Sequence, residues 1–504
     1  MTTSLISIDW RVLVPVLAPA IGALLVLLVD ALAPRARGLH LPIGLAALGA
    51  GLGGLPYAVT TATPTRTLCL PGPDARCFYE TGPTGTTLQL IALAASLLVL
   101  LMLGPGTRHL DRMQRGGPAV TVGLVLAATT GAVMVVAARD LPTWLVAIEL
   151  ATLPAVALVA LSRGRGSEGG ALSLLMVSLT SFAFLACGIG LWVLATGDAS
   201  FSTDTLRVAF DDTPRHRVLL LSILFLLAGL GFKLSTVPFH TWTPQAFVVS
   251  DEPIAAYLAT VSKAAAVGAA VVVLGPLVSV TAAGSDDGHS IRLVLGVLAA
   301  ASMTLGNLVA LRADDPVRLL AWSTIAQAGW VLAPLAMLTP TAVSASVAYL
   351  LVYVVGSLAV FAVTAAVHPR AEGAGDRSLT AYRGLARRSP LLAIVLGLGL
   401  LTLAGLPPAV LGVVAKIVAI TPVVATGQWW LVAVLVVNIV LGIAVYLRWL
   451  LYAVRPAPSI TPGDTAESAP APRLDPGLRI ALLLLAAALV LLSLVPGLAL
   501  GLAR

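Results

Sequence analysis

The three lysines of the chain are the residues whose type and position most clearly predict chemistry. Lys233, Lys263 and Lys416 all lie inside apolar segments, whereas the arginines lie in loops or near the ends of such segments. A buried lysine can release and rebind a proton because desolvation disfavours its charged form, but an arginine stays protonated under essentially all conditions. A charge near the centre of a bilayer costs at least ~2.5 kcal/mol, so we expect three such residues to serve a function. The pattern predicts that these lysines handle protons.

Glu149 and His240 are two further ionisable residues in apolar surroundings. Glu149 lies about eight residues, or ~12 Å, into an apolar run. We expect it to pair with Lys233, because a nearby carboxylate favours a charged amine and a change in its field would release the proton. A static salt bridge is the alternative. His240 follows Pro238 by two residues and either carries protons or caps an interrupted helix.

Two apolar stretches are too long to be single membrane spans. Residues 218–249 and 390–424 cover 32 and 35 residues, whereas a bilayer needs ~20. Each stretch holds helix breakers near its middle, STVPFHTWTP in the first and AGLPP in the second. Paired broken helices in two halves of a chain indicate a repeated transporter whose path lies near the midplane. A packing kink made by proline is the alternative for either stretch.

The composition indicates a membrane protein. Of 504 residues, 58% are apolar and 11% are charged, and the mean hydropathy is +0.99. These values lie far outside the range of soluble domains. Apolar runs that could cross a bilayer recur along the whole chain, and we count about fourteen. The expected fold is an all-α polytopic membrane protein surrounded by the lipid bilayer.

Arginines gather in alternate loops, and this predicts the orientation because short cytoplasmic loops hold the excess of positive charge. With fourteen spans, both termini are then expected outside. The pI near 9.7 follows from this topology and gives a nucleic-acid partner no support. The loops expected outside hold Asp74, Glu80, Asp198, Asp204, Asp211, Asp212, Asp286 and Asp287. The cytoplasmic loops hold Arg35, Arg37, Arg108, Arg112, Arg115, Arg163, Arg165, Arg312, Arg318, Arg370, Arg377, Arg383, Arg387, Arg388, Arg455 and Arg473.

The spans divide the chain into four parts. Residues 119–279 are expected to form one five-helix repeat and residues 292–452 a second. Because five is an odd number, the second repeat must be inverted relative to the first. Residues 1–118 would form three preceding helices, and residues 453–504 a flexible cytoplasmic loop and a final span.

Cys69 and Cys77 share a loop that we expect outside, with a Pro-Gly-Pro turn between them. Their spacing permits a disulfide in an oxidising compartment without requiring one. Two free thiols are the alternative.

Several of these segments resemble one known family. GFKLSTVPFHTWTP, residues 231–244, is similar to the broken-helix motif of subunit N of bacterial NADH-quinone oxidoreductase, respiratory complex I, and SKA at residues 262–264 follows at the family's distance. Residues 303–312 and 318–330 resemble its ninth and tenth helices. Residues 382–390 and 404–408, with Lys416, resemble its eleventh-to-twelfth connection and second broken helix. The resemblance covers roughly residues 119–452.

The resemblance implies a fourteen-helix antiporter-like fold in a bacterial inner (plasma) membrane. Glu149, Lys233, Lys263 and Lys416 match the proton-path residues of the family. The resemblance also implies that this chain binds no cofactor. FMN, iron–sulfur clusters, NADH and quinone would bind to partner subunits, among them other membrane subunits of the complex.

The chain departs from the family pattern at three places, one of them an additional residue between Pro408 and Gly412. Gln327 stands where the family usually has His, and Gln can order water but cannot bind a proton at neutral pH. Residues 245–253 introduce Asp251 and Glu252 near the expected cytoplasmic face. We therefore treat Gln327 as a candidate hydrogen-bonding point in the proton path.

Three functions remain open on the sequence alone. The first is a proton-translocating subunit of a redox-driven complex. The second is a subunit of a multisubunit Na⁺/H⁺ antiporter without redox coupling. The third is a structural paralogue that has lost transport, which the presence of Gln327 keeps open.

Overall fold

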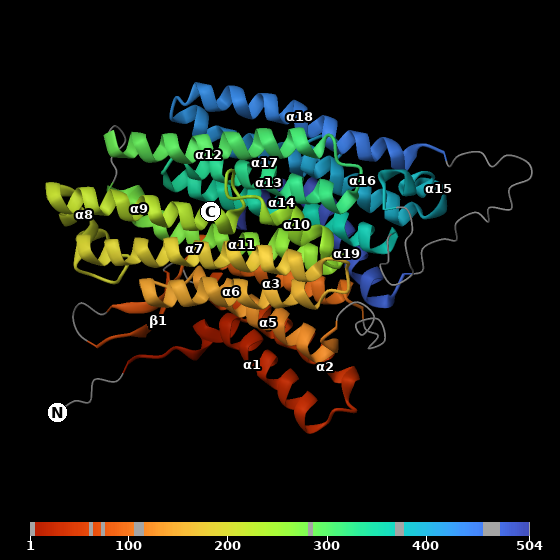
Figure 1. Ribbon diagram of the computed structural model, residues 1–504, viewed down its shortest axis with the longest axis horizontal. Helices are drawn as coiled ribbons and strands as arrows, with labels where there is room; N and C mark the ends of the chain where they lie inside the picture. The colour runs from red at the N-terminus through yellow and green to blue at the C-terminus, as the bar shows by residue number, and fades with distance from the viewer. Residues whose placement is uncertain are drawn as a thin grey trace, which may run out of the picture.

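Long α-helices that run side by side make up almost the whole molecule (Figure 1). The computed structural model describes residues 6–59, 64–71, 76–104, 115–280, 286–367, 377–456 and 474–502. Within these ranges, twelve helices are long and apolar enough to cross a membrane. The shorter apolar helices α16 (Pro390–Ala404) and α17 (Val410–Ala425) and the almost fully buried helix α13 (Pro316–Leu335) accompany them. The all-α polytopic fold predicted from the sequence is confirmed.

The elements follow one another along the chain in three groups. The first group is α1 (Trp10–Leu32), η1 (Arg37–Leu39), α2 (His40–Val59), β1 (Thr65–Cys69), β2 (Cys77–Thr81) and α3 (Pro83–Met102). The second is α5 (Gly117–Val135), α6 (Leu141–Leu161), α7 (Ser167–Thr196), α8 (Thr203–Asp211), α9 (Thr213–Leu234), α10 (Trp242–Val249) and α11 (Glu252–Val280). The third is α12 (Asp286–Ala310), α13, α14 (Pro340–Val367), η3 (Leu379–Tyr382), α15 (Leu385–Arg388), α16, α17, α18 (Trp429–Val454), α19 (Pro476–Leu494) and α20 (Pro496–Leu502).

Local sequence signals fix where many of these helices begin. Asp9, Asp140 and Asp315 each accept a hydrogen bond from a backbone N–H in the first turn of α1, α6 and α13. Such capping satisfies donors that have no partner within the helix. Proline occupies the first or second position of α3, α6, α13 and α16, where its missing N–H is not needed.

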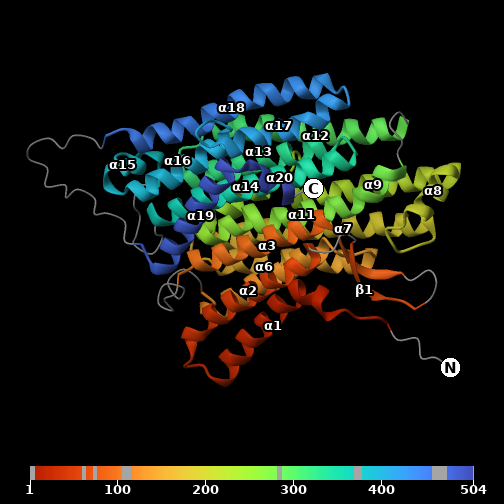
Figure 2. The same cartoon turned by 180° about the vertical axis from the view of Figure 1, so that it is seen from behind.

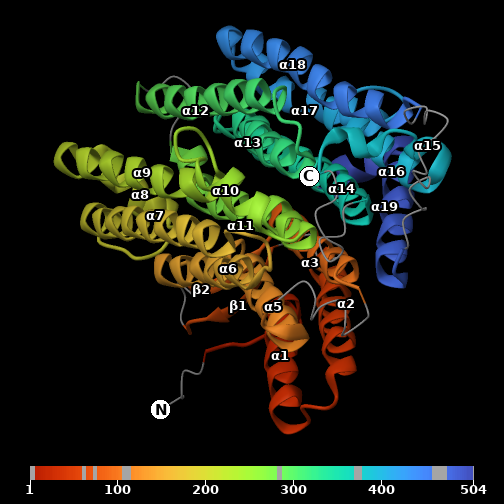
Figure 3. The same ribbon diagram turned by 45° about the vertical axis from the view of Figure 1, so that its right-hand side comes forward.

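Helices α11 and α14 are central to the bundle. Figure 3 shows α1 and α2 at one side, α12 and α18 at the other, and α11 and α14 between them. Helix α11 contacts α3, α5, α6 and α9 of the earlier part of the chain, and it also contacts α13 and α14. This packing brings the two helix sets around 119–279 and 292–452 together; their division into two inverted repeats stays a prediction.

Both over-long apolar stretches are broken helices, as predicted. The first consists of α9 and α10, separated by residues 235–241, and the second of α16 and α17, separated by residues 405–409. Each first half ends at a residue in the left-handed region, Ser235 with φ 62° and Gly405 with φ 74°. In each break, the N–H of the next residue bonds back to a carbonyl five residues earlier, as in a Schellman cap.

The two ends of the bundle differ in what they carry. The β-hairpin (β1 and β2) and α8 lie at one end, and α15 lies at the other (Figures 1 and 2). Connectivity places the arginine-bearing loops that follow α1, α6 and α12 at the end opposite to the hairpin. Arg108, Arg112, Arg370, Arg473 and Asp74 lie outside the described residues, as do 457–473 of the linker and 368–376 of the basic loop.

Asp251 lies between α10 and α11, Glu252 is the first residue of α11, and both are buried. Glu252 Oε1 lies 3.0 Å from Arg377 Nη2 of the basic segment before η3. This ion pair fastens the segment to the start of α11.

The hairpin holds a disulfide between Cys69 and Cys77, which resolves the alternative that the sequence left open. Isolated bridges join Ser7 to Cys69 and Tyr79 to Ala138, so the hairpin links the chain before α1 to the connection between α5 and α6. Burial raises the pKa of Tyr79 to about 12, and its neutral hydroxyl accepts a hydrogen bond from Gln89 Nε2 at 2.8 Å.

The disulfide predicts the thiol count of the protein. In denatured but unreduced protein, only Cys187 of the three cysteines should react with an alkylating reagent, and all three should react after reduction. Intact-protein mass spectrometry counts the added groups. A Cys69→Ser variant serves as the control and should show two reactive thiols before reduction. Three reactive thiols in the unreduced native sequence would exclude the disulfide.

Gly405 should tolerate alanine less well than Gly427, although both have positive φ. An added Cβ at Gly405 would lie 2.7 Å from Lys416 Cδ, whereas nothing lies within 4 Å of a Cβ at Gly427. Both variants carry the left-handed strain of about 1–2 kcal/mol, but only Gly405→Ala must also displace Lys416. We expect a larger loss of apparent melting temperature for Gly405→Ala in detergent. Equal losses would show that Lys416 does not pack against this glycine.

Candidate functional site

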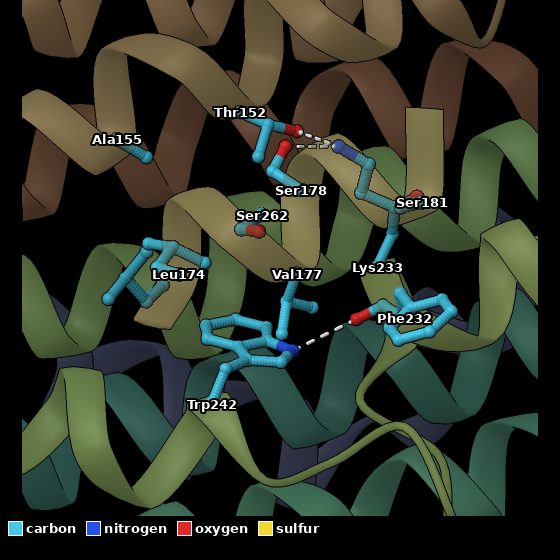
Figure 4. A pocket seen from close by; sticks show the side chains of 11 residues that line it. Thr152, Ala155, Leu174, Val177, Ser178, Ser181, Phe232, Lys233, Trp242 and Ser262 are labelled. Atoms are coloured by element: carbon cyan, nitrogen blue, oxygen red, sulfur yellow. Dashed lines mark hydrogen bonds between the residues drawn. The ribbon is translucent and has the colours of Figure 1, made fainter. Parts of the chain in front are cut away.

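Glu149 and Lys233 form a buried ion pair. Lys233 Nζ lies 2.9 Å from Glu149 Oε1, with side-chain exposures of 7% and 13%. Lys233 Nζ also donates to Thr152 Oγ1 at 3.1 Å and to Ser178 Oγ at 2.9 Å (Figure 4). The amine thus combines one ion pair with two hydrogen bonds to hydroxyl groups. The expected pairing of the first broken helix with Glu149 is present in the structure.

Ser178 connects both members of this pair. Its hydroxyl accepts from Lys233 and lies 3.4 Å from Glu149 Oε2, to which it donates. A cavity of about 10 Å³ adjoins Lys233 and is lined by Ser178, Trp242 and Ser262 among other residues (Figure 4). That volume is about what one water molecule needs. The cavity therefore extends from Lys233 to Ser262, the residue before Lys263.

Lys263 of α11 reaches the end of the same broken helix. Its Nζ donates to the backbone carbonyl of Lys233 at 3.2 Å and to Ser235 Oγ. Ser235 Oγ also accepts from Thr243 Oγ1 of α10 at 2.6 Å, across the break. The amine lies 4.8 Å from the centre of a Trp242 ring. The two lysines thus contact each other through the last turn of α9.

Lys416 occupies a similar position at the second break. Its Nζ donates to the carbonyl of Ala404, the last residue of α16. It lies 5.3 Å from the centre of a Trp330 ring. Gly405 makes room for this side chain, because a Cβ there would lie against Lys416.

Lys263 and Lys416 therefore share one type of environment. Each amine meets a carbonyl at the C-terminal end of the first half of a broken helix, and each faces an indole ring. The C-terminal end of a helix carries partial negative charge and carbonyls without partners. An indole face attracts a cation as well. Helix ends and aromatic rings thus stabilise both amines in their charged form.

The two sites differ in their counter-charge. Glu149 pairs with Lys233 beside the first break. Among the described residues, no carboxylate forms an ion pair with Lys263 or Lys416. Within the described residues, therefore, only Lys233 has a neighbouring carboxylate that can control its charge directly.

Gln327 is held by two tyrosines between α13, α14 and α18. Tyr349 donates to Gln327 Oε1 at 2.6 Å, and Gln327 Nε2 donates to Tyr446 at 2.9 Å. Tyr446 also shares a 2.6 Å hydrogen bond with Ser323. Gln327 is 3% exposed, so its amide is buried and bonded at both ends. The structure thus places it in a polar cluster on the way from α11 to α17.

His240 lies in the first break but stands apart from the lysines. Its ring centre lies 5.4 Å from that of Trp322, and its backbone carbonyl accepts from Thr243 N at 3.0 Å. No hydrogen bond in the described structure joins its side chain to Lys233 or Lys263. The carbonyl contact belongs to the backbone, so both roles expected of the His240 side chain, carrying protons and capping the break, stay predictions.

Sequence reasoning missed the hydroxyl and aromatic partners. Thr152 lies three residues after Glu149, and Trp330 lies three residues after Gln327. Residues so spaced share one face of a helix, and this signal was present in the sequence. Ser178 and Ser235 carried no such signal, because their roles depend on how α7 and α9 pack.

No group of three or more His, Cys, Asp or Glu residues that could hold a metal ion occurs in the described part of the chain. The site is instead built from lysines, one carboxylate, hydroxyls and carbonyl groups. Such groups can hold, release and pass protons.

The chain is similar to proteins named as subunits of NADH-quinone oxidoreductase. It is 37% identical over 512 residues to NADH-quinone oxidoreductase subunit N 2 of Streptomyces griseus subsp. griseus, covering 97% of this chain and 92% of that protein. It is also 37% identical over 461 residues to NADH-quinone oxidoreductase subunit N of Salinispora tropica, covering 88% and 84%. These relatives confirm the resemblance to subunit N.

Solved structures share the fold. A chain of respiratory complex I from Thermus thermophilus matches with a TM-score of 0.77 at 28% identity, covering 97% of this chain and 98% of that one. A chain of the Mrp complex from Dietzia sp. matches with a TM-score of 0.79 at 20% identity, covering 98% and 96%. The latter likeness shows the fold alone.

The family model described as NADH:quinone oxidoreductase/Mrp antiporter, TM matches residues 138–442, which hold both broken helices and all three lysines. This match covers more than half of the chain, and the two relatives cover most of it. The chain belongs to the NADH:quinone oxidoreductase/Mrp antiporter family of membrane subunits.

Proposed function

We propose that this chain is the subunit N type of membrane subunit in a respiratory NADH-quinone oxidoreductase and that it translocates protons. The observation that carries the proposal is the buried Glu149–Lys233 pair at the end of a broken helix. The relatives named as subunit N support the assignment to such a complex. Quinone reduction elsewhere in the complex would supply the energy.

The first site can act as a switch. The charged form of Lys233 is stabilised by Glu149, Thr152 and Ser178. If Glu149 moves away or loses its charge, the desolvated amine loses its main compensation and releases its proton. Lys263 donates hydrogen bonds to the backbone carbonyl of Lys233 and to Ser235. A change in the conformation of the break therefore alters the surroundings of both lysines. The proton then passes along the relay toward Gln327 and Lys416.

This chain would contribute no redox chemistry of its own. NADH, FMN, iron–sulfur clusters and quinone would bind to partner subunits, and other membrane subunits would be neighbours. The chain would serve the oxidoreductase as its translocating part.

We place the hairpin end outside a bacterial plasma membrane, with both termini outside. The Cys69–Cys77 disulfide at that end suits an oxidising compartment. The arginine-bearing loops at the opposite end suit the cytoplasmic side.

Two other functions have specific observations in their favour. The matching family includes Mrp antiporters, so a subunit of a Na⁺/H⁺ antiporter without redox coupling is the first alternative. Gln327 suits a structural paralogue that has lost transport. Co-purification with a complex that oxidises NADH supports the main proposal against the antiporter, and measured pumping excludes the structural role.

Replacing Lys233 should abolish this chain's share of proton pumping with little effect on assembly. Lys233→Ala removes the amine that Glu149 holds, and a group that transfers protons typically contributes 10²–10⁴-fold in rate. Lys233→Arg should fail almost as badly, because Arg cannot release its proton. Proton uptake per NADH oxidised in reconstituted complex is the measurement. Wild-type pumping by the Arg variant would leave Lys233 a fixed-charge role only.

Gln327 should be replaceable by His but not by Leu. Leucine cannot bond to Tyr349 or Tyr446 and would dry the cluster, whereas His can accept and donate as Gln does. We expect the Leu variant to pump fewer protons per NADH oxidised and the His variant to pump at the wild-type ratio. An unchanged ratio in the Leu variant would contradict a path through Gln327 and favour the structural paralogue.

A further inference from the structure

Three tyrosines fill the space between the two lysine sites. Tyr349 and Tyr353 lie on α14 and Tyr446 lies on α18, with exposures of 4%, 3% and 1%. They come together where α11, α13 and α14 pack against one another. A buried tyrosine hydroxyl normally needs a hydrogen-bond partner. The partners of these hydroxyls define a route between the sites.

Tyr353 joins the first helix set to the second. Its hydroxyl lies 2.8 Å from the carbonyl oxygen of Ala259 on α11 and 3.1 Å from Thr324 Oγ1 on α13. Ala259 precedes Lys263 by four residues, about 6 Å along the helix axis. Tyr353 thus lies about one turn from Lys263 and contacts the helix that carries Gln327.

Tyr349 continues this route one turn further along α14. Four residues separate it from Tyr353, so the two side chains share a face of the helix. Its hydroxyl donates to Gln327 Oε1 at 2.6 Å. Its ring stacks on Trp330, with centroids 5.7 Å apart and an interplanar angle of 15°. Trp330 also lies beside Lys416, whose Nζ is 5.3 Å from the centre of a Trp330 ring.

The remaining tyrosine, Tyr446, orients the amide. It accepts from Gln327 Nε2 at 2.9 Å, and this bond fixes Oε1 toward Tyr349. Because Gln327 does not bind a proton at neutral pH, the groups able to exchange protons here are the hydroxyls beside it.

We propose that the hydroxyls of Tyr353 and Tyr349 carry the proton from Lys263 to Lys416 past Gln327, with Tyr446 as a positioning residue. The inference rests on the proposed function. In the resting structure Tyr353 donates to the carbonyl of Ala259 and Tyr349 donates to the amide oxygen of Gln327, and neither acceptor can take the proton. Each hydroxyl therefore first turns toward a water, then accepts a proton on its oxygen as it gives its own to that water, so it ends unchanged. The ammonium of Lys263 loses one proton and the neutral amine of Lys416 gains one, with no electron transfer.

Water completes the route. Among the described residues, no hydrogen bond joins Lys263 to Tyr353, Tyr353 to Tyr349, or Tyr349 to Lys416 directly. Bridging water is nearly as favourable as a direct hydrogen bond and can close such intervals. Tyr353 and Tyr349 are the fixed hydrogen-bonding groups between these waters.

The competing interpretation is that these hydroxyls only fasten helices to one another, as polar side chains often do in membranes. The chain offers a matched control for that role. Tyr257 of α11 is 1% exposed, and its hydroxyl lies 3.3 Å from Thr129 Oγ1 of α5, which in turn bonds Ser96. Tyr257 joins helices in the same way but leads away from Lys416.

The test replaces each hydroxyl in the complete, reconstituted complex. We expect Tyr349→Phe and Tyr353→Phe to lower protons pumped per NADH to the value of Lys233→Ala, and Tyr257→Phe to leave the ratio at wild type. Phenylalanine keeps the ring and its packing, and NADH oxidation with complex yield reports assembly. Adding Gln327→His to Tyr349→Phe should restore much of the ratio, because imidazole both accepts and donates a proton.

The outcomes separate the two proposals. If Lys233→Ala abolishes pumping but both α14 variants pump as wild type, the tyrosine route is wrong and the proposed function stands. If Lys233→Ala pumps as wild type, the proposed function itself fails. Two results would show that the tyrosines only join helices and would overturn the inference. One is an equal loss of protons pumped per NADH in Tyr257→Phe and in the α14 variants. The other is no restoration of that ratio by Gln327→His.

Discussion

The structure depends on compensating a positive charge that is buried inside an apolar helix bundle. An isolated charge in such surroundings is expensive, and here the compensation comes largely from interrupted helices. Lys263 and Lys416 each donate to a carbonyl in the last turn of α9 or α16 and face an indole ring. The breaks therefore do more than bend the chain, since they expose the acceptors that the amines need.

The two breaks are alike in backbone but unequal in charge. Ser235 and Gly405 both end a half-helix in the left-handed region, but only Ser235 adds a hydroxyl for a lysine. Glu149 adds a full counter-charge at the first break. A change at Glu149 would act first on Lys233 and reach Lys416 only through the polar cluster between them. In the proposed relay, a carboxylate therefore controls the first lysine, Lys233, whereas none of the described carboxylates pairs with Lys263 or Lys416.

The sequence predicted the parts of this arrangement that are unusual in composition. Lysines and a glutamate in apolar runs, and prolines within over-long runs, stand out without knowledge of packing, and Lys233, Glu149 and both breaks follow from them. The contact of Lys263 with the carbonyl of Lys233 did not follow, because a backbone acceptor leaves no mark in composition. Tyr349 and Tyr353 were equally hidden, since their partners lie on α13 and α11 and depend on how α14 packs. The cytoplasmic loop residues beyond the described ranges stay predictions.

A double-mutant cycle on pumping tests most directly whether Glu149 controls the proton on Lys233. Protons pumped per NADH would be measured in reconstituted complex with wild-type sequence, Glu149→Gln, Lys233→Ala and both changes together. If the two residues act as one unit, each single variant loses this chain's share and the double variant loses no more. Losses that simply combine, or a Glu149→Gln variant that pumps at the wild-type ratio, would contradict the account.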